Sequence, residues 1–125
     1  MQYEEFISNV AERAGLPREE TEKVVAAVFR TLGERLSGGE AEDLRAQLPK
    51  QLQAHLVSPE ENAQSFGIEE FARRVAQRAG VDEADAGAGA IAVLKTLREA
   101  VSPGEFDEVL AQLGREFAAL ADSRP

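Results

Sequence analysis

The sequence contains a single histidine, a residue type that often takes part in catalysis or metal binding. His55 could act as a general base or as a metal ligand. Di-iron helical bundles use a Glu-x-x-His spacing, but the residue three positions before His55 is Leu52, so the spacing is missing. The residue 65 positions later is Leu120, which places His55 at a partly apolar edge. The sequence therefore favours a surface or partly packed histidine over a metal ligand.

Serines and carboxylates are the other candidates for catalysis. Ser37, Ser58 and Ser102 each begin a Ser-x-x-Glu capping box, which predicts a role at helix starts. The sequence has no Gly-x-Ser-x-Gly elbow, and the lone histidine cannot be assigned to any serine as its base. Most Asp and Glu residues fall on expected polar helix faces, which are typical of solvated surfaces. We therefore expect no catalytic residues, no metal site and no enzyme.

A glycine-rich segment matches the residue pattern of a cofactor-binding motif but not the structural context that the motif requires. Residues Gly87–Ala92 (GAGAIA) match a relaxed dinucleotide fingerprint, G-x-G-x-x-G/A. That fingerprint binds a pyrophosphate where it joins a strand to a helix. Here it falls inside an expected helix, where small residues allow another helix to cross closely. We therefore expect no cofactor.

Three polar residues recur 65 positions later: Arg13, Thr31 and Gln47 as Arg78, Thr96 and Gln112. They could form two symmetric ligand sites, with the arginines as anchors for an anion. They could instead hold the fold together, which is favoured because buried polar groups need partners. The candidate positions for a ligand or structural role are Arg13, Gln47, Arg78 and Gln112.

Particular partners follow from the structural interpretation. Arg13 is expected to pair with a carboxylate of another helix, Glu40 or Asp43. Thr31 is expected to bond to the carbonyl four residues earlier, and Gln47 to satisfy a helix end near Pro49.

Composition excludes several classes of protein. The 125 residues carry 14 Lys and Arg against 23 Asp and Glu, a net charge of −9. Cysteine is absent, which removes disulfides and thiolate zinc sites. The only adjacent basic pair, Arg73-Arg74, lies close to Glu69 and Glu70, so neither nucleic acid nor an anionic membrane is an expected partner. An acidic N-terminal stretch without a secretory pattern predicts a cytoplasmic location, and the excess of Arg over Lys is typical of a GC-rich bacterium.

The sequence repeats itself at an offset of 65 residues. Residues 4–52 align with 69–117 without a gap, and 19 of the 49 pairs are identical. A repeat of this kind predicts two equivalent units, at about 3–56 and 68–121, joined by a connector at 57–67. Units this small bury little apolar surface alone, so we expect them to share one core within a single domain, 1–125.

Each repeat predicts three helices and no strand. Apolar residues from Tyr3 to Ala14 follow helical spacing, and Gly15 suits a left-handed C-terminal cap. A second helix is expected from near Pro17, with Asp82 as the N-cap of its counterpart. The third opens with a capping box, and Pro49 is expected to kink or restart it. The expected fold class is all-α, a single bundle of about six helices with pseudo-twofold symmetry.

Three segments together carry a family resemblance: Glu4–Phe6 (EEF), Val10–Leu16 (VAERAGL) and Thr31–Pro49 (TLGERLSGGEAEDLRAQLP). They resemble the bacterial domain family of unknown function DUF2267, from about Tyr3 to Leu120. The second repeat departs from the pattern, with Pro103 in place of a glycine and Gly114 in place of the proline. The resemblance implies a small cytoplasmic helical domain of bacteria, and it brings no activity or catalytic residues.

Two functions remain open from the sequence. The first is a non-enzymatic helical module for protein interaction or regulation, with a protein partner or a second copy of the chain bound through a leftover apolar strip. The alternative is a small-ligand-binding helical domain with its site between the two repeats.

Overall fold

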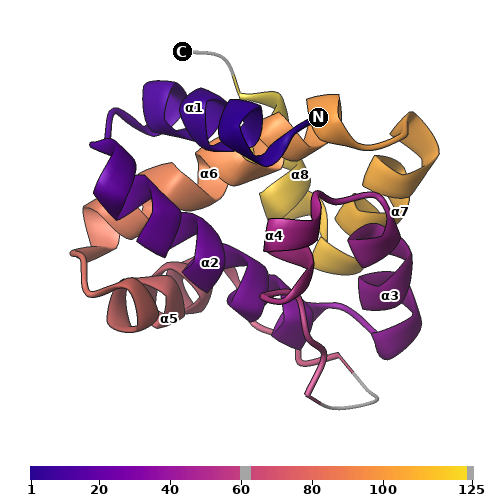
Figure 1. Ribbon diagram of the computed structural model, residues 1–125. Coiled ribbons are helices and arrows are strands. Elements are labelled where there is room, and N and C mark those ends of the chain that lie inside the picture. Colours follow the sequence, from indigo (N-terminus) through magenta and orange to yellow (C-terminus); the bar gives the residue numbers. More distant parts are fainter. Residues whose placement is uncertain (60–62, 124–125) are drawn as a thin grey trace.

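The computed structural model describes residues 1–59 and 63–123, and in this part of the chain the structure is all helical, without a strand (Figure 1). The described helices, in chain order, are α1 (Tyr3–Ala14), α2 (Arg18–Arg35), α3 (Gly38–Ala46), α4 (Lys50–Gln53), α5 (Ile68–Ala79), α6 (Glu83–Ala100), α7 (Pro103–Leu113) and α8 (Arg115–Asp122). The predicted all-α class is therefore confirmed.

The described residues form eight helices rather than about six, because the last helix of each half is broken in two. Pro49 precedes α4 with an extended ψ of 148°, and its missing N–H prevents α3 from continuing. The predicted restart at Pro49 is thus confirmed. Gly114 separates α7 from α8 at a φ of 97°, a conformation that a residue with a side chain rarely adopts.

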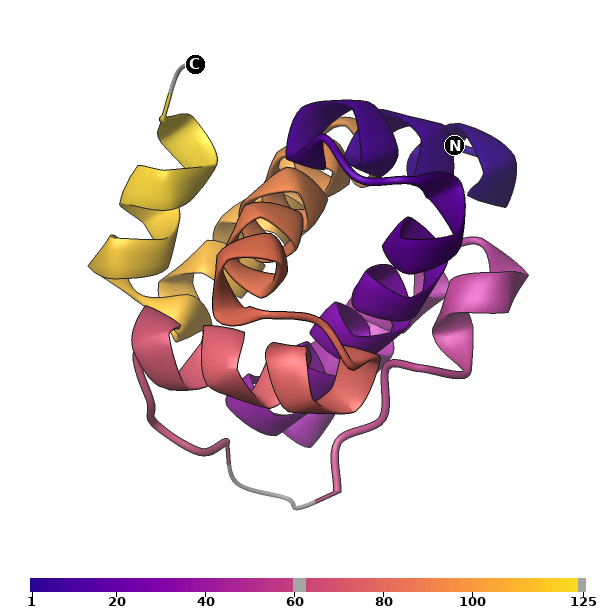
Figure 2. The same ribbon diagram turned by 90° about the vertical axis from the view of Figure 1, so that its left-hand side faces the viewer.

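The four long helices form a frame around a shared core. In Figure 2, α1 and α5 lie on opposite sides, α2 and α6 form the other two sides, and α8 and α4 flank the frame. Helices of the two halves pack on each other, because α1 lies along α6 and α2 contacts both α5 and α6. Phe6 and Phe29 pack at 5.8 Å between ring centroids, and Phe71 and Phe117 at 5.4 Å. One continuous apolar cluster draws residues from all eight described helices, as a single bundle requires.

Helix ends follow the local sequence signals. Gly15 and Gly80 cap α1 and α5 in the left-handed conformation, at φ values of 69° and 71°. Asp82 accepts a bond from the Asp85 N–H at 2.8 Å, so the predicted N-cap of α6 is confirmed. The predicted turn at Ser58–Glu61 lies partly outside the described residues, which omit 60–62.

Two glycines allow backbones to approach closely. The motif Gly87–Ala92 lies inside α6, as predicted, and a Cβ at Gly89 would overlap the side chain of Val24 on α2. A Cβ at Gly33 would lie 2.8 Å from the carbonyl carbon of Val57 and closer still to its oxygen. The connector is therefore pressed against α2 at Gly33.

None of the described helices combines the length and apolar character needed to cross a membrane.

Candidate functional site

The recurring arginines tie the two halves together. Arg78 on α5 donates to the Thr31 hydroxyl at 2.9 Å and pairs with Glu34 at 2.6 Å, both on α2. The hydrogen bonds from Arg78 lower the pKa of Glu34 below its ordinary value. Thr31 in turn donates to the carbonyl of Ala27 at 2.8 Å, so the predicted bond four residues back is confirmed.

Arg13 makes the matching contacts on the other side of the molecule. Its guanidinium donates to Thr96 at 2.9 Å and pairs with Glu99 at 2.8 Å, both on α6. The expected pairing with Glu40 or Asp43 is wrong, because α1 packs along α6 and not along α3. The hydrogen bond from Arg13 lowers the pKa of Glu99.

The two glutamines cap helix starts in the opposite half. Gln112 Oε1 accepts from the Ser37 N–H at 2.8 Å, and Gln47 Oε1 accepts from the Ser102 N–H at 2.7 Å. The expectation that Gln47 serves a helix end near Pro49 is therefore wrong, since it reaches the start of α7 instead. The four candidate positions thus do not form one site, and each links the two halves.

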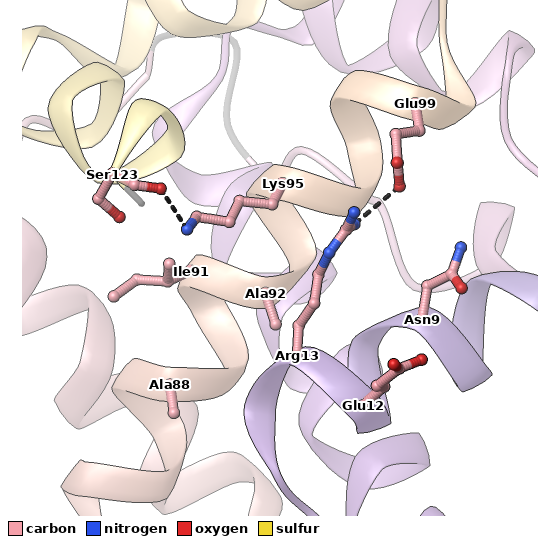
Figure 3. A pocket seen from close by; sticks show the side chains of 9 residues that line it. All are labelled: Asn9, Glu12, Arg13, Ala88, Ile91, Ala92, Lys95, Glu99 and Ser123. Carbon is pink, nitrogen blue, oxygen red and sulfur yellow. Dashed lines mark hydrogen bonds and ion pairs between the residues drawn. The ribbon is translucent and has the colours of Figure 1, made fainter. Parts of the chain in front are cut away.

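A pocket lies between α1, α6 and the end of α8 (Figure 3). Its volume is about 840 Å³, within the usual range for small-molecule sites. The residues that line it are Asn9, Glu12, Arg13, Ala88, Ile91, Ala92, Lys95, Glu99 and Ser123. Figure 3 shows Arg13 directed to Glu99 and Lys95 directed to the main-chain carbonyl of Ser123. Ile91 and its alanine neighbours form an apolar wall beside these polar groups.

A smaller pocket of about 430 Å³ lies at the corresponding place beside α2. Arg30, Glu34 and Arg78 line it together with His55, which is exposed. The predicted surface position of His55 is confirmed. No carboxylate–histidine metal cluster occurs among residues 1–59 and 63–123.

A cluster of four carboxylates lies where α3 meets α7. Glu40 and Asp43 come from α3, Glu105 and Glu108 come from α7, and one carboxylate oxygen of each lies within 4.8 Å of the others. The serines of the two capping boxes accept from the N–H groups of Glu40 and Glu105 at 3.2 and 3.3 Å. In a complete capping box the glutamate side chain would accept from the serine N–H. Here Gln112 accepts from the Ser37 N–H and Gln47 from the Ser102 N–H, so neither glutamate makes that bond. The capping boxes are therefore only half formed.

Glu40 and Glu105, which make no capping bond through their side chains, lie next to each other in a buried position. Glu40 and Glu105 are each 7% exposed, and Glu40 Oε1 and Glu105 Oε2 have no hydrogen-bond partner among the described residues. Burial, followed by a hydrogen bond with Glu105 and the charge of Glu105, together raise the pKa of Glu40 to about 8. At neutral pH a proton therefore occupies Glu40. The sequence predicts capping roles for Glu40 and Glu105, and for Glu40 also a pairing with Arg13, but it does not predict that the two glutamates meet.

Arg35 is a second buried charge, which no sequence pattern indicated. Its guanidinium donates to the carbonyl of Gln64 at 3.1 Å and to that of Leu113, and it lies 5.4 Å from the ring centroid of Phe117. Burial lowers the pKa of Arg35. This side chain holds the connector and the end of α7 against α2, which is a structural task.

The structure thus has two separate candidate sites: a pocket with an apolar wall between α1 and α6, and a group of carboxylates where α3 meets α7. A family model described as "Uncharacterized conserved protein (DUF2267)" matches residues 3–120, nearly the whole chain. No curated protein matches the sequence.

Proposed function

We propose that this chain, which belongs to the DUF2267 family of uncharacterised conserved proteins, is a non-enzymatic regulatory module that binds a small amphipathic molecule between α1 and α6. The observation that carries the proposal is the pocket of about 840 Å³ formed between the two halves. A ligand held there contacts α1 and α6 at once, so its binding stabilises one arrangement of the halves over others.

The lining indicates the class of ligand. Ala88, Ile91 and Ala92 provide an apolar wall, which suits a short hydrocarbon body. Lys95 has a main-chain carbonyl as its partner, and a carbonyl does not neutralise its charge. Arg13, by contrast, is already paired with Glu99. A carboxylate attached to a short apolar chain is therefore the ligand that best complements this pocket, with Lys95 as the anion anchor.

The outer surface favours this proposal over docking of a protein through an apolar face. Among the described residues, the exposed large hydrophobic side chains are Met1, at 38%, and Val57, at 57%. These two residues do not make the apolar strip that a homodimer or partner helix would cover. A protein partner or homodimer, like a bacterial origin and a cytoplasmic location, stays a prediction from the sequence.

We also infer that the chain is a single domain built from two copies of one unit, at about 3–56 and 68–121, related by a pseudo-twofold axis. Helices α5 and α6 begin and end 65 residues after α1 and α2, respectively, which supports this inference. So do the two Arg–Thr bonds, both of 2.9 Å. Residues on such an axis meet their own counterparts, as Glu40 meets Glu105. At a second such place Val24 meets Gly89, where two valines would not fit.

Thermal denaturation with octanoate as the probe tests the ligand proposal. A saturable rise in Tm is expected for the natural chain, because the ligand binds only the folded state. The Lys95→Met variant should lose this rise, while Lys23→Met, the same change at an exposed lysine on α2, should keep it. Octylamine, with the opposite charge, should give no rise. A flat response to octanoate, or an equal response in Lys95→Met, would overturn the proposal.

A further inference from the structure

We infer that Glu40, Asp43, Glu105 and Glu108 form a binding site for a calcium ion at the junction of α3 and α7. The site is separate from the α1–α6 pocket and shares no residue with it. Its ligands are two carboxylates from each half of the chain, so the ion would link the halves directly.

The spacing of the carboxylates matches the size of the ion. One oxygen from each residue lies within 4.8 Å of the other three. Two oxygens on opposite sides of a Ca²⁺ ion lie about 4.6–5.2 Å apart, because each Ca–O distance is about 2.3–2.6 Å. Mg²⁺ is usually bound through one or two carboxylates and keeps several waters, whereas Ca²⁺ accepts more oxygen ligands, so four converging carboxylates favour Ca²⁺. Carboxylate oxygens are the ligands that such hard cations prefer.

The buried oxygens are the second, independent indication of a ligand. Glu40 and Glu105 are more than nine-tenths buried, and each carries a carboxylate oxygen that has no hydrogen-bond partner in the described part of the chain. Unless the two carboxyl groups share a proton, these oxygens face only each other, and buried polar atoms in folded proteins nearly always have a partner. A cation between them supplies a partner for both and removes the repulsion between the two carboxylates.

The four acids are arranged for entry from solvent. Asp43 and Glu108 are exposed and lie one helical turn beyond the buried pair, at i+3 on α3 and on α7. Residues at this spacing lie on the same helix face, so the exposed acids form the rim above the buried ones. Hydrated Ca²⁺ would meet the rim first and then exchange water for the buried oxygens.

Calorimetric titration of the full-length, chelator-treated protein with CaCl₂ tests the inference, with NaCl of equal ionic strength as the reference. We expect saturable binding of one ion per chain. Glu105→Gln should abolish binding. Asp107→Asn, an exposed acid of α7 outside the cluster, should bind as the natural chain does.

Stability of the unliganded variants separates loss of the site from loss of the fold. Glu105→Gln replaces one of the two buried carboxyl groups by a neutral group of the same shape, so its Tm without calcium should equal or exceed that of the natural chain. Retained binding in Glu105→Gln would assign the ion to the outer surface and overturn the inference. Absence of saturable binding by the natural chain would overturn it as well, and would leave the pair as two carboxyl groups that share a proton.

Discussion

Replacement of Glu40 by glutamine should remove most of the pH dependence of stability between pH 4.5 and about pH 8. Glu40 is 7% exposed and faces Glu105, and burial together with the neighbouring Glu105 raises its pKa from 4.5 to about 8. Below pH 4.5 the group is protonated in both the folded and the unfolded chain, so it costs nothing. Between pH 4.5 and about pH 8 the unfolded chain releases the proton while the folded chain retains it. The free energy of unfolding therefore falls as pH rises through this window, and it levels off above it.

The size of the effect follows from the two pKa values. At 1.36 kcal/mol per pKa unit, the difference between 4.5 and about 8 corresponds to about 5 kcal/mol. This is the largest effect expected, because any rearrangement that admits water to the pair reduces the penalty. Glutamine has the same shape and no titration, so Glu40→Gln should be several kcal/mol more stable than the natural chain at about pH 9. The two should be similar at about pH 4.

Urea unfolding at a series of pH values, with a chelator present, measures this directly. The control is Glu42→Gln, which removes the same charge from an exposed position on α3. Its profile should run parallel to that of the natural chain, because the acidic surface contributes equally to both. Parallel profiles for Glu40→Gln and the natural chain would refute the assignment of the raised pKa to this buried pair.

Two further predictions concern contacts between segments. Gly33→Ala should destabilise the chain by about 1–3 kcal/mol, because the added methyl overlaps the carbonyl of Val57, whereas Gly87→Ala, where a Cβ meets nothing within 4 Å, should stabilise it by about 0.5–1 kcal/mol. Equal shifts of the two Tm values in calorimetry would contradict this. Gln112→Ala removes the acceptor of the Ser37 N–H and should cost about 1 kcal/mol in urea unfolding, and Gln47→Ala should cost about as much through Ser102. An unchanged midpoint in both glutamine variants would show that water replaces these caps at no cost.

Signals carried within one helix were sufficient for the predictions that held. Gly15 has the αL cap expected of it because a glycine after an apolar stripe adopts this conformation without a steric penalty. Asp82 caps α6 because its side chain reaches an N–H three residues on. Pro49 restarts the helix because it has no N–H.

Local sequence signals did not predict which residues of other helices a side chain would contact. Arg13 was expected to pair with Glu40 or Asp43 and instead pairs with Glu99, since nothing in the local pattern states that α1 packs along α6. The same reason accounts for Gln47, which leaves its own half for Ser102. The 65-residue repeat could have suggested these cross-pairings, because it predicts matched contacts between the halves.

The sequence by itself determined the all-helical class of this protein, the local caps at Gly15 and Asp82, the family and the absence of cysteine chemistry. These properties depend on residue types and on spacings of a few positions. The tertiary structure alone decided that two capping glutamates meet in a buried pair and that a pocket opens between α1 and α6. Both depend on the relative position of helices more than 40 residues apart in the chain, and that position is set by the packing of the shared core.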